Sequence, residues 1–300
     1  MTHHHFFTAL LLAGVAGPLA GCTIETTEKY VGDPFTRDAD WTSGQNLDVT
    51  GLNGQIEVVR GEEGVVRATF EPFTFRGSDE ASEAKNEMEN ILVAEVVDNG
   101  DSIIVRTNRE SGGSSSLGAL ITIEIPPDFD AGIYVEQGNG DAEVNFVGEA
   151  AEVRIDNDGS GECYVYGAPS VRNTVVSCSG STLVRNVSDR VDIETTGIEA
   201  VANIELVSID PDAGNSRIYT EDGDIVLALP NDANFWIWAL VASPEGQVNT
   251  GPVPDDCSEE EAEARSKSVF CGGEDEGPEF DLQAGLDPLD DEVNIELKYQ

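Results

Sequence analysis

Short runs of alternating apolar and polar residues dominate the chain from residue 45 to residue 252. The runs at 142–146 and 191–194 are examples, and turn pairs such as Asp222-Gly223 separate them. Successive side chains of a strand point to opposite faces, so each run predicts a β-strand with one buried face. Many short strands separated by glycine turns predict an all-β protein.

A longer pattern occurs twice in this region. An apolar strand at 121–125 ends at Pro126, another at 225–229 ends at Pro230, and an Asp, a further strand and a Gly turn follow each. Three similar units of about 20 residues are headed by Val153, Val171 and Val191. This period predicts a single-chain β-solenoid (a β-helix-like stack of about 20-residue coils). A β-sandwich or a barrel would have a similar number of strands and is the alternative.

One helix interrupts the strands. Residues 78–92 place four apolar side chains at i, i+3, i+7 and i+10: Ala81, Ala84, Met88 and Ile91. Ser78 is the expected N-cap, with acidic residues in the first turn. We expect this helix to cap one end of the solenoid, because the last coil would otherwise expose its edge and its core.

The N-terminus predicts export. Residues 6–15 are apolar but too few to span a bilayer, as in a secretory signal peptide. Leu19-Ala20-Gly21-Cys22 resembles a bacterial lipobox, which implies a diacylglyceryl group on Cys22 and cleavage before it. Several acyl chains suffice for stable anchoring. The alternative is an ordinary secretory signal in which Cys22 occurs by chance.

These features divide the chain into four parts. They are a lipoprotein signal peptide (1–21), a lipidated tether (22–44), a β-solenoid domain (45–252) and an acidic C-terminal segment (253–300). Within the last part we expect a short helix at 258–267 and a strand at 293–299, with the segment packing on the solenoid's last coils.

The four remaining cysteines predict disulfides, since an exported chain meets an oxidising compartment. Proximity in sequence favours Cys163 with Cys178 and Cys257 with Cys271. A zinc site is the alternative, but these cysteines have neither CxxC spacing nor an accompanying His.

The charge balance limits the partners. The chain has 58 acidic and 16 basic residues, a formal net charge of −42, so a nucleic-acid backbone would be repelled. All three His lie at positions 3–5, within the expected signal peptide. The mature chain would lack the commonest general base and metal ligand. We therefore expect no metal and no cofactor.

Three stretches resemble a known family. They are Leu52-Asn-Gly-Gln-Ile-Glu-Val58, Asp222-Gly-Asp-Ile225 and Leu227-Ala-Leu-Pro-Asn-Asp-Ala233. They resemble the bacterial "putative adhesin" solenoid domains, a family without an established function, over about residues 45–252. The resemblance implies stacked, parallel-type strands on an exported or membrane-tethered protein. It supplies no catalytic residues.

The best candidate binding residues are aromatic. Alternation in 235–240 points Trp236 and Trp238 outward, where the earlier copy of the pattern has Gly132 and Tyr134. Either the C-terminal segment covers the two Trp side chains, or they form, with Tyr134, a platform for a sugar or a partner protein. A second candidate, residues 156–162, has the oxygen ligands of a calcium loop, but Gly159 is misplaced for an EF-hand. We interpret this stretch as an acidic turn.

The sequence therefore favours a lipid-anchored protein of the bacterial cell envelope that serves as a surface-binding, adhesin-like or structural module. Thr23 after Cys22 indicates the outer membrane, by analogy with enteric bacteria. A glycan or an envelope protein is the expected ligand. The alternative is a polysaccharide-active enzyme, a lyase or hydrolase, on the same fold, although no catalytic triad or phosphate loop is present.

The anchor can be tested directly. In Cys22→Ala no thiol can accept the diacylglyceryl group, so we expect an unprocessed precursor on immunoblots and no metabolic labelling with a radioactive fatty acid. A product trimmed to the normal size and released without detergent would contradict the lipid anchor.

Overall fold

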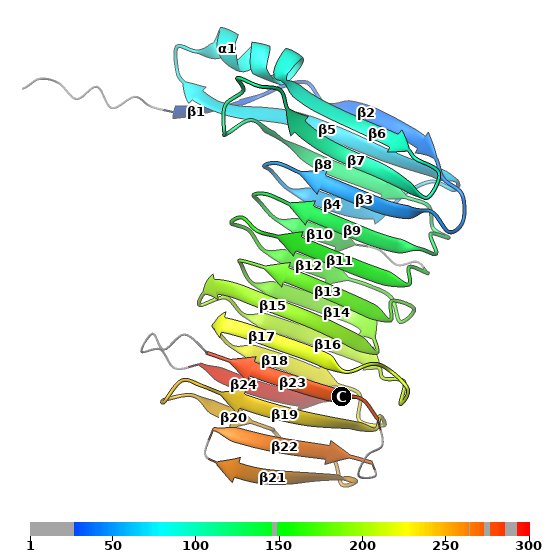
Figure 1. The fold of residues 1–300 in the computed structure, drawn as a ribbon, viewed down its shortest axis with the longest axis vertical. Helices are drawn as coiled ribbons and strands as arrows, with labels where there is room; N and C mark the ends of the chain where they lie inside the picture. The colour runs from blue at the N-terminus through cyan, green and yellow to red at the C-terminus, as the bar shows by residue number, and fades with distance from the viewer. Residues whose placement is uncertain (1–26, 146–148, 264, 273–276, 286–292) are drawn as a thin grey trace, which may run out of the picture.

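The structure is a computed structural model that describes residues 27–145, 149–263, 265–272, 277–285 and 293–300. The predicted signal peptide and Cys22 lie outside these residues. The described residues form two β-sheets of twelve strands each, which do not close into a barrel (Figure 1). No helix in the described ranges has the length and hydropathy needed to cross a membrane.

The first sheet, here called sheet A, contains β1 (Thr27–Val31), β2 (Phe35–Asp40), β4 (Ile56–Arg60), β5 (Val65–Gly77), β8 (Gly118–Ile125), β10 (Ala142–Asn145), β12 (Cys163–Tyr166), β14 (Thr182–Ser188), β16 (Ala202–Ser208), β18 (Ile225–Leu229), β20 (Gln247–Asn249) and β24 (Asn294–Tyr299). The second, sheet B, contains β3 (Asn46–Gly51), β6 (Leu92–Asp98), β7 (Ser102–Arg109), β9 (Gly132–Gln137), β11 (Glu152–Asn157), β13 (Asn173–Cys178), β15 (Arg190–Ile198), β17 (Ser216–Asp222), β19 (Phe235–Val241), β21 (Cys257–Glu263), β22 (Ser266–Cys271) and β23 (Glu279–Ala284).

From β9 to β18 the chain alternates between the sheets. Each strand pairs in parallel with the strand two further along, so β9, β11 and β13 are neighbours in sheet B. Ile133 pairs with Val153, Val153 with Thr174 and Thr174 with Val191. These spacings are 153 − 133 = 20, 174 − 153 = 21 and 191 − 174 = 17 residues, close to the predicted period. The second unit begins at Thr174 rather than Val171. Val171 lies in a turn instead, where its backbone amide donates a hydrogen bond to the carbonyl of Ala168.

The core lies between the two sheets. Along β8, β13 and β18 every second side chain is buried, as alternation predicts. Buried residues of both sheets form one continuous hydrophobic cluster, whose largest fully buried side chains include Phe70, Phe129, Phe235 and Phe280. Among the described residues the buried charged side chains are Glu87, Asp189 and Asp222.

Antiparallel pairs close both ends of the stack. At the N-terminal end β5 pairs with β1, β2 and β8, and β6 pairs with β7. Residues 27–40 lie wholly within the predicted tether (22–44), but they contain two strands of sheet A, β1 and β2. Their polar sequence concealed this, because β2 is an edge strand with only Phe35 and Ala39 partly buried.

The helix lies at this N-terminal end (Figure 1). It comprises α1 (Ala81–Asn86) and a π-helical turn, η1 (Glu87–Ile91). The predicted N-cap Ser78 is wrong, since Glu80 precedes the first turn and makes no capping side-chain hydrogen bond. Of the predicted apolar face, Ala84 is buried, Met88 and Ile91 are half-buried, and Ala81 is exposed.

The C-terminal segment enters the stack. β23 lies between β17 and β19 in sheet B, and β24 lies between β18 and β20 in sheet A. Figure 1 shows both as red strands among the yellow ones. The sequence pattern gives no sign of this insertion, because strand order depends on which edges meet in space.

The helix expected at 258–267 is absent, and the antiparallel hairpin of β21 and β22 occupies this stretch. Cys257 and Cys271 pair across the hairpin and form one of the two disulfides that the sequence predicts. A cross-strand pair of this kind holds the chain extended, which outweighs the helix propensity of its Glu and Ala residues.

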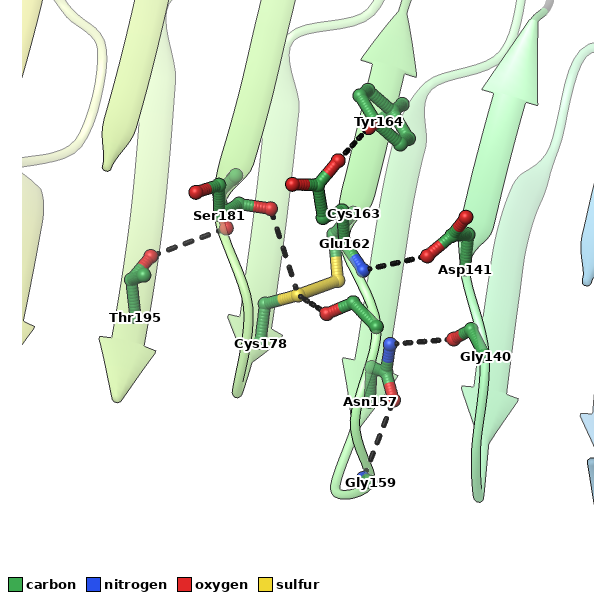
Figure 2. Close-up of a disulfide and its surroundings, with 12 residues drawn as sticks. Gly140, Asp141, Asn157, Gly159, Glu162, Cys163, Tyr164, Cys178, Ser181 and Thr195 are labelled. Atoms are coloured by element: carbon green, nitrogen blue, oxygen red, sulfur yellow. Dashed lines mark hydrogen bonds between the residues drawn. A yellow bond between two sulfur atoms is a disulfide. The ribbon is translucent and has the colours of Figure 1, made fainter. Parts of the chain in front are cut away.

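The other predicted disulfide, Cys163 with Cys178, joins β12 of sheet A to β13 of sheet B (Figure 2). It lies inside the core, with both cysteines at most 1% exposed. One step along the stack, the hydroxyl of Thr195 donates to that of Thr182 at 3.1 Å. The disulfide therefore covalently links the two sheets at the edge of the glycine turns.

Glycine turns lie directly on one another along this edge. A Cβ added to Gly140 would overlap the carbonyl oxygen of Gly54, and a Cβ on Gly161 would overlap that of Gly140. The Asn157 side chain donates to the Gly140 carbonyl at 3.0 Å and accepts from the Gly159 amide at 3.3 Å. Strand spacing of about 4.8 Å leaves backbone against backbone here, so these positions require glycine.

This stacking gives a matched pair of variants. Gly140 and Gly100 both have positive φ, at 111° and 93°, but nothing lies within 4 Å of a Cβ at Gly100. We expect Gly100→Ala to cost about 1–2 kcal/mol of unfolding free energy from its φ alone. Gly140→Ala should cost about 1–3 kcal/mol more, because the added methyl overlaps a neighbouring turn. Urea unfolding of the two variants measures the difference, and equal costs would contradict the stacked turns.

A buried carboxylate fastens the helix to the stack. Glu87 is 2% exposed and accepts hydrogen bonds from Thr74 Oγ1 at 3.0 Å, Arg76 Nε at 3.1 Å and the Ser114 amide at 2.7 Å. Burial by itself raises the pKa of Glu87, but the bonds from Arg76, Ser114 and Thr74 outweigh it and hold the pKa below its usual range. Glu87 thus joins η1, β5 and the loop before β8.

Because the folded-state pKa of Glu87 is lowered, its contribution to stability is present above pH 4.5 and is lost as the pH falls through the folded-state pKa. We expect Glu87→Gln to cost roughly 3 kcal/mol near neutral pH, since it leaves the Arg76 guanidinium without its partner. The deficit should shrink in unfolding experiments below pH 4.5. Glu89→Gln, whose parent side chain is 60% exposed, is the control and should change little. A Glu87→Gln deficit that does not depend on pH would refute this account.

Candidate functional site

Trp236 and Trp238 lie on the outer face of sheet B. β19 buries Phe235, Ile237 and Ala239, so the alternate side chains point away from the core. Trp236 is 39% exposed, and Trp238 is half-buried. Trp236 is one of five large hydrophobic side chains that are exposed among the described residues.

The hairpin beside β19 contributes a third ring. Phe270 of β22 is the register partner of Trp236, and the two rings stack with centroids 5.7 Å apart and an interplanar angle of 11°. We call Trp236, Trp238 and Phe270 the aromatic patch. The C-terminal segment borders the patch within the same sheet, on β22 and β23, and leaves Trp236 open to solvent.

Carboxylates line the other side of the patch. Glu279 and Asp281 of β23 are the register partners of Trp236 and Trp238. The Asn215 side chain donates to Glu279 at 3.4 Å, and the Gln283 side chain donates to Asp281 at 3.0 Å. Neither carboxylate has a Lys or Arg within ion-pair distance among the described residues. Their free lone pairs can accept hydrogen bonds from a ligand.

The next strand adds a cation. Arg217 of β17 is the register partner of Asp281, and its guanidinium lies 5.5 Å from the centroid of the Tyr219 ring. The sheet order β22, β19, β23, β17 therefore places three aromatic side chains, two carboxylates and an arginine on one surface about 14 Å across. Flat apolar faces beside hydrogen-bonding groups suit a ligand that has both apolar faces and hydroxyls.

Tyr134 is not part of this patch. It lies on the same outer face and in the same register row as Trp238, but β9 is six strand spacings from β19, about 29 Å. The predicted platform of Trp236, Trp238 and Tyr134 is therefore wrong as a single site. The repeat in the sequence predicted that Tyr134 and Trp238 lie on the outer face of a strand. It gave no information on how many strands separate its two copies in the sheet.

Tyr134 belongs to a separate depression. A hollow of about 400 Å³ is lined by its ring and by Asp48, Glu136, Arg154 and Asp156. The Tyr134 hydroxyl lies 3.5 Å from Glu152, and burial together with this carboxylate raises the pKa of Tyr134. Arg154 does not stand out in the sequence, because its polar run resembles any solvent-exposed strand face.

Sheet A carries a second aromatic pair that the sequence analysis also missed. The rings of Tyr164 and Tyr166 stack with centroids 6.5 Å apart and an interplanar angle of 3°. The Tyr164 hydroxyl donates to Glu162, as Figure 2 shows. Glu143 of β10 is the register partner of both Tyr164 and Glu57, and burial, then Glu57 and Asp141, raise its pKa. The alternation of residues in Cys163–Tyr166 indicates in the sequence that Tyr164 and Tyr166 lie on the same face of a strand.

The calcium-like stretch 156–162 comprises the end of β11, at Asp156 and Asn157, and the connection to β12 at 158–162. Asn157 points inward onto the turn backbone (Figure 2), so its side-chain oxygen already accepts a hydrogen bond. In the described residues no cluster of three or more His, Cys, Asp or Glu side chains is arranged to hold a metal ion.

No family model and no curated protein matches the chain. Three similar solved structures are a "putative cell adhesion protein" of Clostridium sporogenes, a "putative adhesin" of Bacteroides fragilis and a "putative lipid binding protein" of Parabacteroides distasonis. Their identities to the chain are 14%, 13% and 11%, with TM-scores of 0.31, 0.40 and 0.36. The matches cover 89%, 89% and 90% of this chain, and 100%, 97% and 97% of those proteins. Likeness at this level carries no argument about function.

Proposed function

We propose that this protein is a non-enzymatic binding module of the bacterial cell envelope, anchored by a lipid on Cys22, that binds its ligand through the aromatic patch. The observation that carries the proposal is the solvent-exposed Trp236, which stacks on the half-buried Phe270 beside the half-buried Trp238. Contiguous apolar surface that reaches solvent is typical of interaction sites.

The architecture supports this role. We infer that the parallel alternation from β9 to β18 is a β-solenoid, in which one strand of each sheet makes one coil. The helix and β1 lie at one end of the stack and β19 lies toward the other (Figure 1). Nine strand spacings separate β6 from β19 in sheet B, about 43 Å. A lipid at Cys22 would therefore hold the patch well away from the membrane.

The ligand follows from the chemistry of the patch. The carboxylates beside the rings can accept hydrogen bonds from sugar hydroxyls or from the N–H groups of a protein. The net charge of −42 disfavours the binding of polyanions. We propose an uncharged glycan of the cell surface, with an envelope protein as the second candidate. Residence in the outer membrane is part of this proposal and rests on Thr23 after Cys22.

The competing function is a polysaccharide-active enzyme. The hollow around Tyr134 favours it, because Arg154 lies among Asp48, Glu136 and Asp156 and makes no ion pair among the described residues. Carboxylates and arginine are the groups with which a β-helical lyase or hydrolase could act without His. Such an enzyme would release soluble products from its polysaccharide.

The aromatic patch can be tested on an array of cell-surface glycans. We expect Trp236→Ala to weaken binding by about 2 kcal/mol or more, as for other exposed aromatic anchors, without a change in unfolding midpoint. Trp41 is only 8% exposed, so any change in tryptophan fluorescence on binding should come from Trp236 and Trp238.

Tyr164→Ala is the matched control, because it removes a ring from the opposite sheet. Binding that is lost equally in Tyr164→Ala and Trp236→Ala would argue against the patch. Release of soluble sugars that is abolished by Arg154→Ala would replace the binding module with the enzyme.

A further inference from the structure

The N-terminal end of the stack contains a groove that the proposed function does not use. It has a volume of about 600 Å³ and lies between β1, β2, the α1–η1 helix and β6. Its lining combines apolar side chains, among them Val31, Phe35, Met88 and Leu92, with the polar and charged side chains of Tyr30, Asp33, Arg37, Lys85 and Glu89. The aromatic patch lies toward the opposite end of the molecule (Figure 1).

The groove exists because the core is not fully closed at this end. Phe35, Leu92 and Ala94 pack against the core cluster but are only partly buried, since no further strands cover them. The helix covers one side through Ala84, which is buried. Val31 remains 51% exposed. A ligand that covers this apolar surface would remove it from water, which is favourable.

Two cations line the groove, Arg37 and Lys85. The Arg37 guanidinium lies 5.0 Å from the centroid of the Phe35 ring and has no carboxylate within ion-pair distance among the described residues. Lys85 Nζ is 3.6 Å from Glu89, and both side chains are mostly exposed. Asp33 and Glu89 also line the groove, so its lining carries two cations and two carboxylates. The Arg37 guanidinium donates to the Thr36 carbonyl at 3.0 Å and has no carboxylate partner in the described part of the chain, although the chain has 58 acidic and 16 basic residues.

We propose that this groove binds a single-chain anionic amphiphile, a long acyl chain that ends in a carboxylate. The chain would lie on Phe35, Met88 and Leu92, and the carboxylate would pair with Arg37 and then Lys85. The volume falls within the range of about 300–1,000 Å³ that is typical of small-molecule sites. This site goes beyond the proposed function and shares no residue with the aromatic patch.

The structure offers a variant that fills the groove without straining the backbone. Gly32 lines the groove, and a Cβ there would lie 3.4 Å from Met88 Sδ and 3.5 Å from Pro72 Cβ, which is ordinary contact. Its φ is not in the left-handed region. Gly32→Leu should therefore occupy the space of the acyl chain, and Gly32→Ala is the matched control.

The test is calorimetric titration of the purified full chain with palmitate. We expect Gly32→Leu to weaken binding by about tenfold, as the exclusion of two methylenes predicts, and Gly32→Ala to change it little. Arg37→Gln should weaken palmitate about threefold and leave uncharged methyl palmitate unchanged. Arg185→Gln, which removes an exposed arginine of β14 that lines neither the groove nor the aromatic patch, is the control and should leave both affinities unchanged.

Three results would overturn the proposal. The first is an unaltered chain that does not bind palmitate. The second is a folded Gly32→Leu that binds palmitate as tightly as Gly32→Ala; if Gly32→Leu does not fold, Arg37→Gln and its insensitivity to methyl palmitate decide alone. The third is concentration-dependent dimerisation that Gly32→Leu abolishes, which would assign the groove to a second copy of the chain.

Discussion

The parallel backbone ladder is the constraint from which the rest of this structure follows. Neighbouring strands lie about 4.8 Å apart, so each turn of the chain rests on the turn before it. At the edge marked by Gly54, Gly140 and Gly161 no side chain fits between them. The Asn157 side chain donates a hydrogen bond to the turn backbone at Gly140. The Cys163–Cys178 disulfide joins the two sheets at the same edge. The three glycines, Asn157 and the disulfide therefore share this edge because the stacked turns bring backbone against backbone there.

The same ladder leaves long outer faces on which side chains stand in rows. Because every strand presents alternate residues outward, a ligand site on these faces is built across strands rather than along the chain. The aromatic patch draws on β19 and β22, and the carboxylates beside it lie on β23; the sequences of these strands are separated but their edges meet. Four adjacent strands, β22, β19, β23 and β17, supply rings, carboxylates and an arginine in this way.

The two ends of the stack solve the problem of exposed edges differently. At the C-terminal end β23 and β24 slot into the sheets, and the disulfide-bonded β21–β22 hairpin completes sheet B. There Lys267 Nζ lies 2.9 Å from Glu259, a pair that helps to close the end of the core. At the N-terminal end a helix held by the buried Glu87 covers only part of the core. The groove beside Arg37 is the part left open.

The sequence by itself determined what depends on neighbouring residues. Alternation assigned the inner and outer faces of β19, which placed Trp236 outward, and proximity paired the four cysteines. It did not determine how the strands outside the repeat of about 20 residues adjoin. The insertion of β23, the distance of Tyr134 from Trp238 and the hairpin at β21–β22 all depend on strand edges that meet across long stretches of chain. Side-chain period is a local property, whereas strand order is decided by packing in three dimensions, and only the tertiary structure contains it.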